Sequence, residues 1–468
     1  MRGAPRGVAA LAAALALVVA GCVDEGEEGG ERPTPVEPPG PAAVVHVVDG
    51  DTGEPVAGAR VRGSGVEGPV ETRTDARGRA TFERAVRRAV ARAPRYGTGQ
   101  STVRLGRATV EIYRAALQSP QYGGNPERTR FVPAVAAAPP RPRQRPDWVF
   151  DAVTLIEFPP AVKDGLAVLG TNSGRVFALD VDTGGVVWET RQKGYIAATP
   201  AIAGDTAYVA SMDGMLSAYR LSDGRARWRF STGGSPVETS PLVVGDTVYV
   251  GTWSGRLFAI DARRGRLRWS AGVPGAIKGS AALAGDRVVV GDYAGNVHAF
   301  GARTGAKRWT YTGGRRFYGG PGVSGDTVVI GDVGGAVVAL DASTGAQRWR
   351  ASTGGSYVYS SPAIAGGRVF IGSYNGRFQA LDLRTGAVRW SFDAGGRISG
   401  SATVVRDTVY VSVLYRPGEP RRTFGLNVRT GAVRYRGDDG RYSPAVAAGK
   451  TLLLVGTRLL YAFKDPAA

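Results

Sequence analysis

Six tryptophans recur along the chain at intervals of 40 or 41 residues: Trp188, Trp228, Trp269, Trp309, Trp349 and Trp390. A glycine stands four residues before each of them, after a run of alternating apolar residues. In residues 240–269 (SPLVVGDTVYVGTWSGRLFAIDARRGRLRW) this pattern predicts four short strands separated by tight turns. Four strands in about 40 residues are typical of one blade of a β-propeller, a small sheet that must stack on its neighbours.

The number of blades follows from the first hairpin turn of each unit. Eight such turns occur, at Gly165, Gly204, Gly245, Gly285, Gly325, Gly366, Asp407 and Gly449. The last unit provides only three strands before the chain ends, whereas the segment 147–150 (DWVF) precedes the first unit. We expect this segment to supply the missing outer strand, which would close the ring and remove its open edges. The sequence therefore predicts an all-β chain with an eight-bladed propeller over residues 147–468.

The N-terminus has the composition of an export signal. Arg2 and Arg6 precede an apolar run over residues 8–20, which is too short to span a membrane, and Val19-Ala20-Gly21-Cys22 follows. This motif resembles a bacterial lipobox, which implies a signal peptide over residues 1–21 and a lipid anchor on Cys22, the only cysteine. Residues 22–41 are predicted to be an acidic tether rich in proline and glycine. Because Val23 rather than aspartate follows Cys22, the resemblance implies the periplasmic face of the outer membrane.

Residues 42–137 are predicted to form a small β-sandwich, joined to the propeller by a Pro/Arg linker over residues 138–146. Alternating valines open the segment, followed by turns at Gly53-Glu54-Pro55 and Thr74-Asp75. About 45 residues resemble the carboxypeptidase-regulatory-like, transthyretin-like sandwich. The resemblance fades after Phe82, and the run 84–97 (RAVRRAVARAPRYG) leaves a short basic helix open as an alternative.

The repeat also carries a family resemblance. The pattern Ala178-Leu179-Asp180, then Thr183-Gly184, then Trp188 resembles the tryptophan-docking motif of quinoprotein-type eight-bladed propellers. It recurs at 259–269, 339–349 and 380–390. The recurring tryptophans are therefore expected to be structural. Each indole would pack between blades while its N–H reaches a backbone carbonyl.

Three functions occur among propellers of this kind. The quinone-dependent dehydrogenases typically use a vicinal disulfide and Ca²⁺, but this chain has one cysteine and two histidines, His46 and His298. No G-x-S-x-G motif occurs either. We therefore expect no catalytic residue, no cofactor and no metal. The combination of lipobox, tether and eight blades resembles BamB, the propeller lipoprotein of the outer-membrane barrel assembly machinery, which implies a protein-interaction scaffold. The N-terminal sandwich departs from that pattern and leaves open a binding module for glycan or another envelope protein.

The formal charge of +19 raises the question of nucleic-acid binding. The positive charge comes almost entirely from arginines spread along the chain, with no basic run longer than two residues. Together with the export signal, this dispersion predicts that nucleic acid is not a partner.

Candidate partner-binding residues lie on the face that carries the longer loops. The loops between the second and third strands place Met212, Trp253, Tyr293 and Tyr374 at equivalent positions, and the links between blades place Glu238, Lys278, Tyr318, Tyr359 and Arg441 around the channel mouth. Aromatic residues with arginine are the residue types that anchor protein interfaces. The alternative is that the aromatic side chains wedge between blades and that the mouth residues merely face water.

Overall fold

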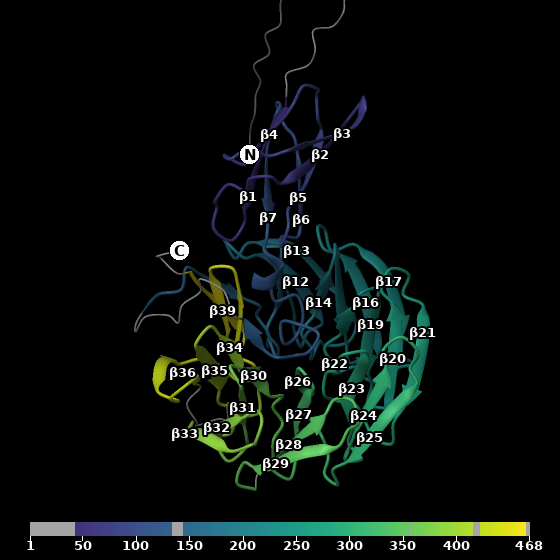
Figure 1. Cartoon of the computed structure of the whole chain (residues 1–468), viewed down its shortest axis with the longest axis vertical. Helices are drawn as coiled ribbons and strands as arrows, with labels where there is room; N and C mark the ends of the chain where they lie inside the picture. Colours follow the sequence, from purple (N-terminus) through teal and green to yellow (C-terminus); the bar gives the residue numbers. More distant parts are fainter. Residues whose placement is uncertain (1–42, 133–143, 356, 415–421, 465–468) are drawn as a thin grey trace, which may run out of the picture. The chain divides into compact units, whose positions relative to one another are not determined.

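The computed structural model describes residues 43–132, 144–355, 357–414 and 422–464 (Figure 1). The predicted signal peptide, Cys22, the tether and most of the Pro/Arg linker lie outside these residues. In the part of the chain that is described, no helix combines the length and the apolar character needed to cross a membrane.

The N-terminal module contains two sheets. The first has the order β4 (Arg79–Phe82), β1 (Ala43–Asp49), β7 (Arg107–Ile112), and the second has the order β3 (Gly68–Arg73), β2 (Arg60–Gly65), β5 (Arg88–Arg92), β6 (Thr98–Thr102). Side chains alternate between core and solvent, as in β1, where Val45 and Val47 are fully buried. The segment 84–97 does not form a helix. It contains β5, because Ala89 and Ala91 face the same core at strand spacing.

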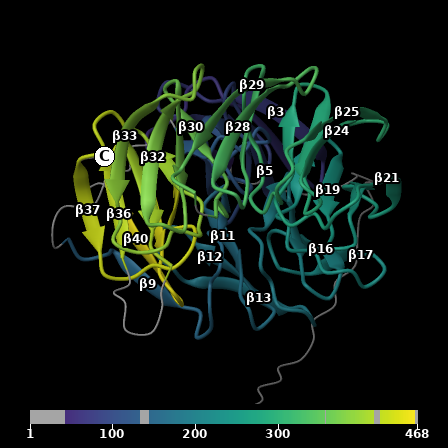
Figure 2. The same ribbon diagram turned by 90° about the horizontal axis from the view of Figure 1, so that it is seen from below.

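The propeller consists of eight sheets that follow one another around a common axis (Figures 1 and 2). Neighbouring strands of a blade are antiparallel, and in blades 1 to 7 they run outward in chain order from an inner strand of three residues. Blades 1 to 4 comprise β10 (Ala161–Lys163), β11 (Leu166–Gly170), β12 (Arg175–Asp180) and β13 (Val186–Arg191); β14 (Ala201–Ala203), β15 (Thr206–Ala210), β16 (Met215–Arg220) and β17 (Ala226–Ser231); β18 (Leu242–Val244), β19 (Thr247–Gly251), β20 (Arg256–Asp261) and β21 (Leu267–Gly272); and β22 (Ala282–Ala284), β23 (Arg287–Gly291), β24 (Asn296–Gly301) and β25 (Lys307–Thr312).

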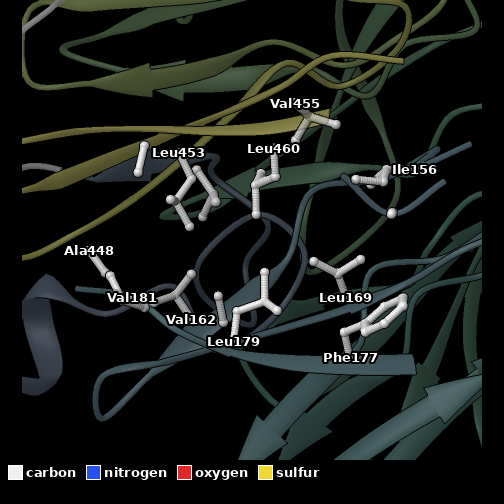
Figure 3. Packing of buried hydrophobic residues seen from close by; sticks show 14 residues of the cluster. Ile156, Val162, Leu169, Phe177, Leu179, Val181, Ala448, Leu453, Val455 and Leu460 are labelled. Carbon is white, nitrogen blue, oxygen red and sulfur yellow. The ribbon is translucent and has the colours of Figure 1, made fainter. Parts of the chain in front are cut away.

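Blades 5 to 8 complete the ring. They comprise β26 (Gly322–Ser324), β27 (Thr327–Gly331), β28 (Ala336–Asp341) and β29 (Gln347–Ser352); β30 (Ala363–Ala365), β31 (Arg368–Gly372), β32 (Arg377–Asp382) and β33 (Val388–Asp393); β34 (Thr403–Val405), β35 (Thr408–Ser412), β36 (Thr423–Asn427) and β37 (Val433–Gly437); and β38 (Ala445–Ala448), β39 (Thr451–Val455), β40 (Leu459–Lys464) and β9 (Trp148–Asp151). The pairing of β9 with β40 confirms that the segment before the first blade supplies the outer strand of the last. Figure 3 shows the core of this closure, where Leu179 of blade 1 and Leu460 of blade 8 are buried together.

Neighbouring blades are joined by one repeated contact. The indole Nε1–H of each repeat tryptophan donates to a backbone carbonyl of the next blade, as from Trp309 to Ala342 at 3.0 Å, and Trp148 does the same with Val181. The other five pairs are Trp188 with Leu221, Trp228 with Ala262, Trp269 with Ala302, Trp349 with Leu383, and Trp390 with Val428. The six-membered part of each ring covers a turn glycine of that next blade, so a Cβ on Gly345 would lie 2.6 Å from Trp309. The glycine and the tryptophan of the repeat thus pack against each other across the blade boundary.

The channel in the middle of the ring is lined by a segment that the sequence analysis placed in the sandwich. Residues 118–132, here called the channel segment, follow the short 3-10 helix η1 (Ala115–Leu117) and end in β8 (Phe131–Val132), which pairs with β34 of blade 7. The middle residue of an inner strand donates its N–H to this segment in blades 1 to 7: Val162 to Ser119, Ile202 to Pro120, Val243 to Gln121, Leu283 to Pro126, Val323 to Glu127, Ile364 to Thr129, and Val404 to Arg130. In blade 8, Ser119 Oγ donates to the carbonyl of Ala447 at 2.8 Å. The segment lies here rather than in the sandwich because the inner edge of every blade otherwise leaves buried backbone groups without partners.

Candidate functional site

Glu238 is the centre of a polar cluster at one rim of the channel. It belongs to the link that enters blade 3, and Trp253 belongs to the loop between β19 and β20 of the same blade. The indole Nε1–H of Trp253 donates to Glu238 Oε2 at 2.9 Å, and the hydroxyl of Tyr318 donates to Glu238 Oε1 at 2.8 Å. Both oxygens of one carboxylate therefore orient aromatic side chains from blades 3 and 5.

Lys278 lies among three of these rings. Its Nζ is 3.9 Å from the ring centre of Trp253, 5.0 Å from that of Tyr293 and 5.5 Å from that of Tyr318. The same ammonium is 3.8 Å from Glu238 Oε2. Cation–π attraction and an ion pair together hold the lysine in place, and the lysine in turn fixes the relative positions of the rings.

A line of tyrosines continues from this cluster around the rim. Ring centres are 6.0 Å apart for Tyr293 and Tyr318, 4.5 Å for Tyr318 and Tyr359, and 4.7 Å for Tyr359 and Tyr374. Tyr357 stacks on Tyr359 at 5.6 Å. We refer to Trp253, Tyr293, Tyr318, Tyr359 and Tyr374, with Glu238 and Lys278, as the aromatic rim.

Two arginines flank the aromatic rim. Arg316 lies 5.8 Å from the ring centre of Tyr293, and Arg397 lies 5.7 Å from that of Tyr374. The rim is partly open to solvent, because Trp253 is 39% exposed, and the neighbouring Tyr357, which stacks on Tyr359, is 51% exposed. Aromatic faces bordered by guanidinium groups form a surface that can bind a partner by stacking and by hydrogen bonds.

Beneath the rim lies a small cavity of about 60 Å³. Tyr122 of the channel segment, Glu157 and Glu238 all line it. Burial, and to a lesser extent the negative charge of Glu238, raise the pKa of Glu157 to about 7, although the positive charge of Arg441 acts in the opposite direction. Burial and the charge of Glu238 also raise the pKa of Tyr318 and keep its phenol protonated.

No group of three or more His, Cys, Asp or Glu side chains is arranged to hold a metal ion within the described ranges. The histidine of the propeller, His298, is buried in blade 4, where its ring nitrogens lie 3.0 Å from Asp292 Oδ2 and 3.1 Å from Thr310 Oγ1. His298 is therefore a hydrogen-bond partner of the buried carboxylate of Asp292 and not a member of the rim.

The structure brings together seven of the nine candidate partner-binding residues. Met212 lies apart in the loop after β15, where its N–H donates to the carbonyl of Tyr195. The guanidinium carbon of Arg441 lies 5.1 Å from the ring centre of Tyr442, and the positive charge of Arg441 lowers the pKa of Glu157. The sequence analysis missed Glu157, although it precedes Pro160 by the same three residues that separate Glu238 from Pro241.

Comparison with known proteins identifies the family. The sequence pattern described as outer membrane protein assembly factor BamB matches residues 143–294 and 293–438, which together exceed half of the chain. The chain belongs to the BamB family. No curated protein matches it. The matched residues cover blades 1 to 7 of the propeller and, of blade 8, only the outer strand β9.

Solved structures of several functions share this family's propeller. The crystal structure of BamB from Moraxella catarrhalis is 20% identical, with a TM-score of 0.51, over 60% of this chain and 94% of that one. A europium-containing methanol dehydrogenase is 15% identical, with a TM-score of 0.63, over 73% and 90%. The quinohemoprotein alcohol dehydrogenase from Comamonas testosteroni is 13% identical, with a TM-score of 0.61, over 74% and 80%. At these identities the likeness shows the fold alone, which enzymes and non-enzymes have in common.

Proposed function

We propose that this chain is a non-catalytic, lipid-anchored envelope protein that serves as an interaction scaffold. Its role would be BamB-like, in the assembly of outer-membrane β-barrel proteins, and the aromatic rim would be its partner-binding surface. Family membership supports the scaffold role, and the lipobox-like motif at Cys22 supports the anchor at the periplasmic face of the outer membrane.

The observation that carries the proposal is the order of the aromatic rim. Trp253 is 39% exposed, yet its indole N–H is bonded to Glu238 and its ring is covered by Lys278. Side chains that are already held in place lose little conformational entropy when a partner binds. Large aromatic residues with this combination of exposure and order are the residues from which binding hot spots are made.

The test is crosslinking in intact envelopes followed by capture of the full chain. We expect wild type to recover a protein of the barrel assembly machinery and the double variant Trp253→Ala with Tyr293→Ala to lose it. Tyr195→Ala is the matched control, because Tyr195 is an exposed aromatic residue of a blade link but is not part of the aromatic rim. It should capture the same protein as wild type.

Two results would contradict the proposal. Unchanged capture by the double variant would mean that the partner binds elsewhere. A loss of several kcal/mol of folding free energy in the same variant would mean that these rings are packing residues. Recovery of glycan without any barrel assembly protein would favour the second candidate, a glycan-binding module. The supporting feature for that candidate is the exposed ring of Tyr357, which stacks on Tyr359.

A further inference from the structure

Two arginines of the channel segment are buried in the middle of the propeller. Arg128 and Arg130 are 1% and 2% exposed. The guanidinium of Arg128 is fully used by backbone carbonyls, since Nε donates to Ala281 at 2.9 Å, Nη2 to Pro241 at 3.0 Å, and Nη1 to Tyr122. Arg128 therefore joins the channel segment to blades 3 and 4.

Arg130 has no comparable set of acceptors. Its Nη1 donates to the carbonyl of Ala402 at a long 3.4 Å, and its guanidinium lies 3.8 Å from the ring centre of Tyr122. Nε and Nη2 are buried and have no partner among the described residues. These two nitrogens form one edge of the guanidinium, where two parallel N–H groups can hold a single acceptor.

The charge of these arginines is not balanced nearby. Neither guanidinium forms an ion pair within the described residues, although the chain has many ion pairs elsewhere, such as that of Arg268 with Asp246. Burial lowers the pKa of both groups to about 9, so both stay charged at neutral pH. A buried charge without a counter-ion is strongly unfavourable.

The side chain of Arg130 lines a small cavity. Its volume is about 20 Å³, and its lining includes Arg130, Thr199 and Thr403. A space of this size holds one water-sized species and is too small for a polyatomic anion such as phosphate or sulfate. Water could accept the two N–H bonds but would leave the positive charge unbalanced.

We propose that the propeller channel binds a single chloride ion at the Nε–Nη2 edge of Arg130. The ion is a structural ligand of the channel segment, which contacts the inner strands of all eight blades. This site lies below Tyr122 and is independent of the partner-binding role of the aromatic rim.

The test uses the full chain at constant ionic strength, with chloride or bromide replaced by gluconate. We expect the midpoint of thermal unfolding to rise by a few degrees with halide concentration and to saturate, as for a ligand of the folded state. Arg130→Gln should abolish this response. Arg229→Gln is the matched control, because it removes one exposed arginine of β17 and should keep the response.

Bromide anomalous scattering from crystals of the wild-type chain locates the ion directly and does not depend on the variant folding. We expect a peak within hydrogen-bonding distance of Arg130 Nε and Nη2. A water molecule without anomalous signal at that position would overturn the proposal. So would a halide response that survives Arg130→Gln.

Discussion

Gly345→Ala tests whether the blades are held together by the contact between tryptophan and glycine. Gly345 has a φ of +76°, and a Cβ there would lie 2.6 Å from Cε3 of Trp309. Trp309 is anchored by its hydrogen bond to Ala342, so its ring can move away only if that bond is lost. Gly325→Ala is the matched control, since Gly325 has a φ of +58° and nothing within 4 Å of the added methyl group.

The two substitutions share one cost and differ in another. A left-handed backbone costs a residue with a side chain about 1–2 kcal/mol at either position. Only Gly345→Ala also displaces the indole, which costs about 1 kcal/mol for the hydrogen bond and about 1–3 kcal/mol for overpacking. We expect Gly345→Ala to lower the free energy of unfolding by about 3–6 kcal/mol and Gly325→Ala by about 1–2 kcal/mol.

Urea denaturation followed by circular dichroism measures both losses. A double-mutant cycle then isolates the contact. With Trp309→Ala present, Gly345→Ala should cost no more than Gly325→Ala does, so the coupling energy should be about 2–4 kcal/mol. Equal losses for the two glycine variants in the wild-type background would refute this account of how the blades dock.

Two further predictions concern the channel. The pKa of Glu157 is raised in the folded chain from its usual 4.5 to about 7, so its contribution to stability is present below pH 4.5 and is lost as the pH rises through about 7. Glu157→Gln should remove this pH-dependent loss, measured as the unfolding midpoint between pH 4 and pH 8. A variant with the same pH profile as wild type would contradict the prediction. Replacing residues 119–132 by a Gly/Ser sequence of equal length should lower the unfolding midpoint by many degrees, because inner-strand N–H groups such as that of Val323 lose their acceptors; an unchanged midpoint would show that water replaces those acceptors at no cost.

The blades could be predicted from the sequence because their signals are local and repeated. A turn glycine such as Gly345 and a tryptophan such as Trp309 each recur every 40 or 41 residues. The glycine of one repeat packs against the tryptophan of the preceding repeat, so the same two positions of the repeat meet at each blade boundary. The outer strand before the first blade was predictable for a related reason: a ring of sheets leaves an open edge unless another segment covers it.

The channel segment could not be predicted in the same way. Its contacts with the blades are made largely by backbone carbonyls, such as those of Pro120 and Pro126, which any residue would provide. Residues 118–132 also have no hydrophobic periodicity, and the last of them, Val132, pairs through its backbone with Val405, which is far away in the sequence. The segment is recognised only when the inner edges of the blades are already in place.

The sequence repeat predicts where the residues of the aromatic rim lie in each blade, but not which of their side chains contact one another. The equivalent residue of each link is known from the repeat, and across the eight units it is Glu157, Ala197, Glu238, Lys278, Tyr318, Tyr359, Ser399 and Arg441. The repeat cannot predict that Glu238 accepts hydrogen bonds from both Trp253 and Tyr318, because this depends on a side chain of blade 3 and a side chain of blade 5 meeting at one carboxylate.

The contrast between constant and variable positions within one chain has a physical explanation. The residues that dock one blade on the next meet the same surroundings at most boundaries, and the tryptophan is accordingly retained from blade to blade. The link residue lies outside the strands of its blade, and its size and charge differ between blades, as among Ala197, Lys278 and Tyr318. Two charged side chains, Glu238 and Lys278, and two tyrosines, Tyr318 and Tyr359, then lie next to one another at a single rim. A surface whose chemistry differs from blade to blade while the framework repeats can be specific for one partner, and for that reason we propose the rim, rather than the repeated turns of the opposite face, as the binding surface.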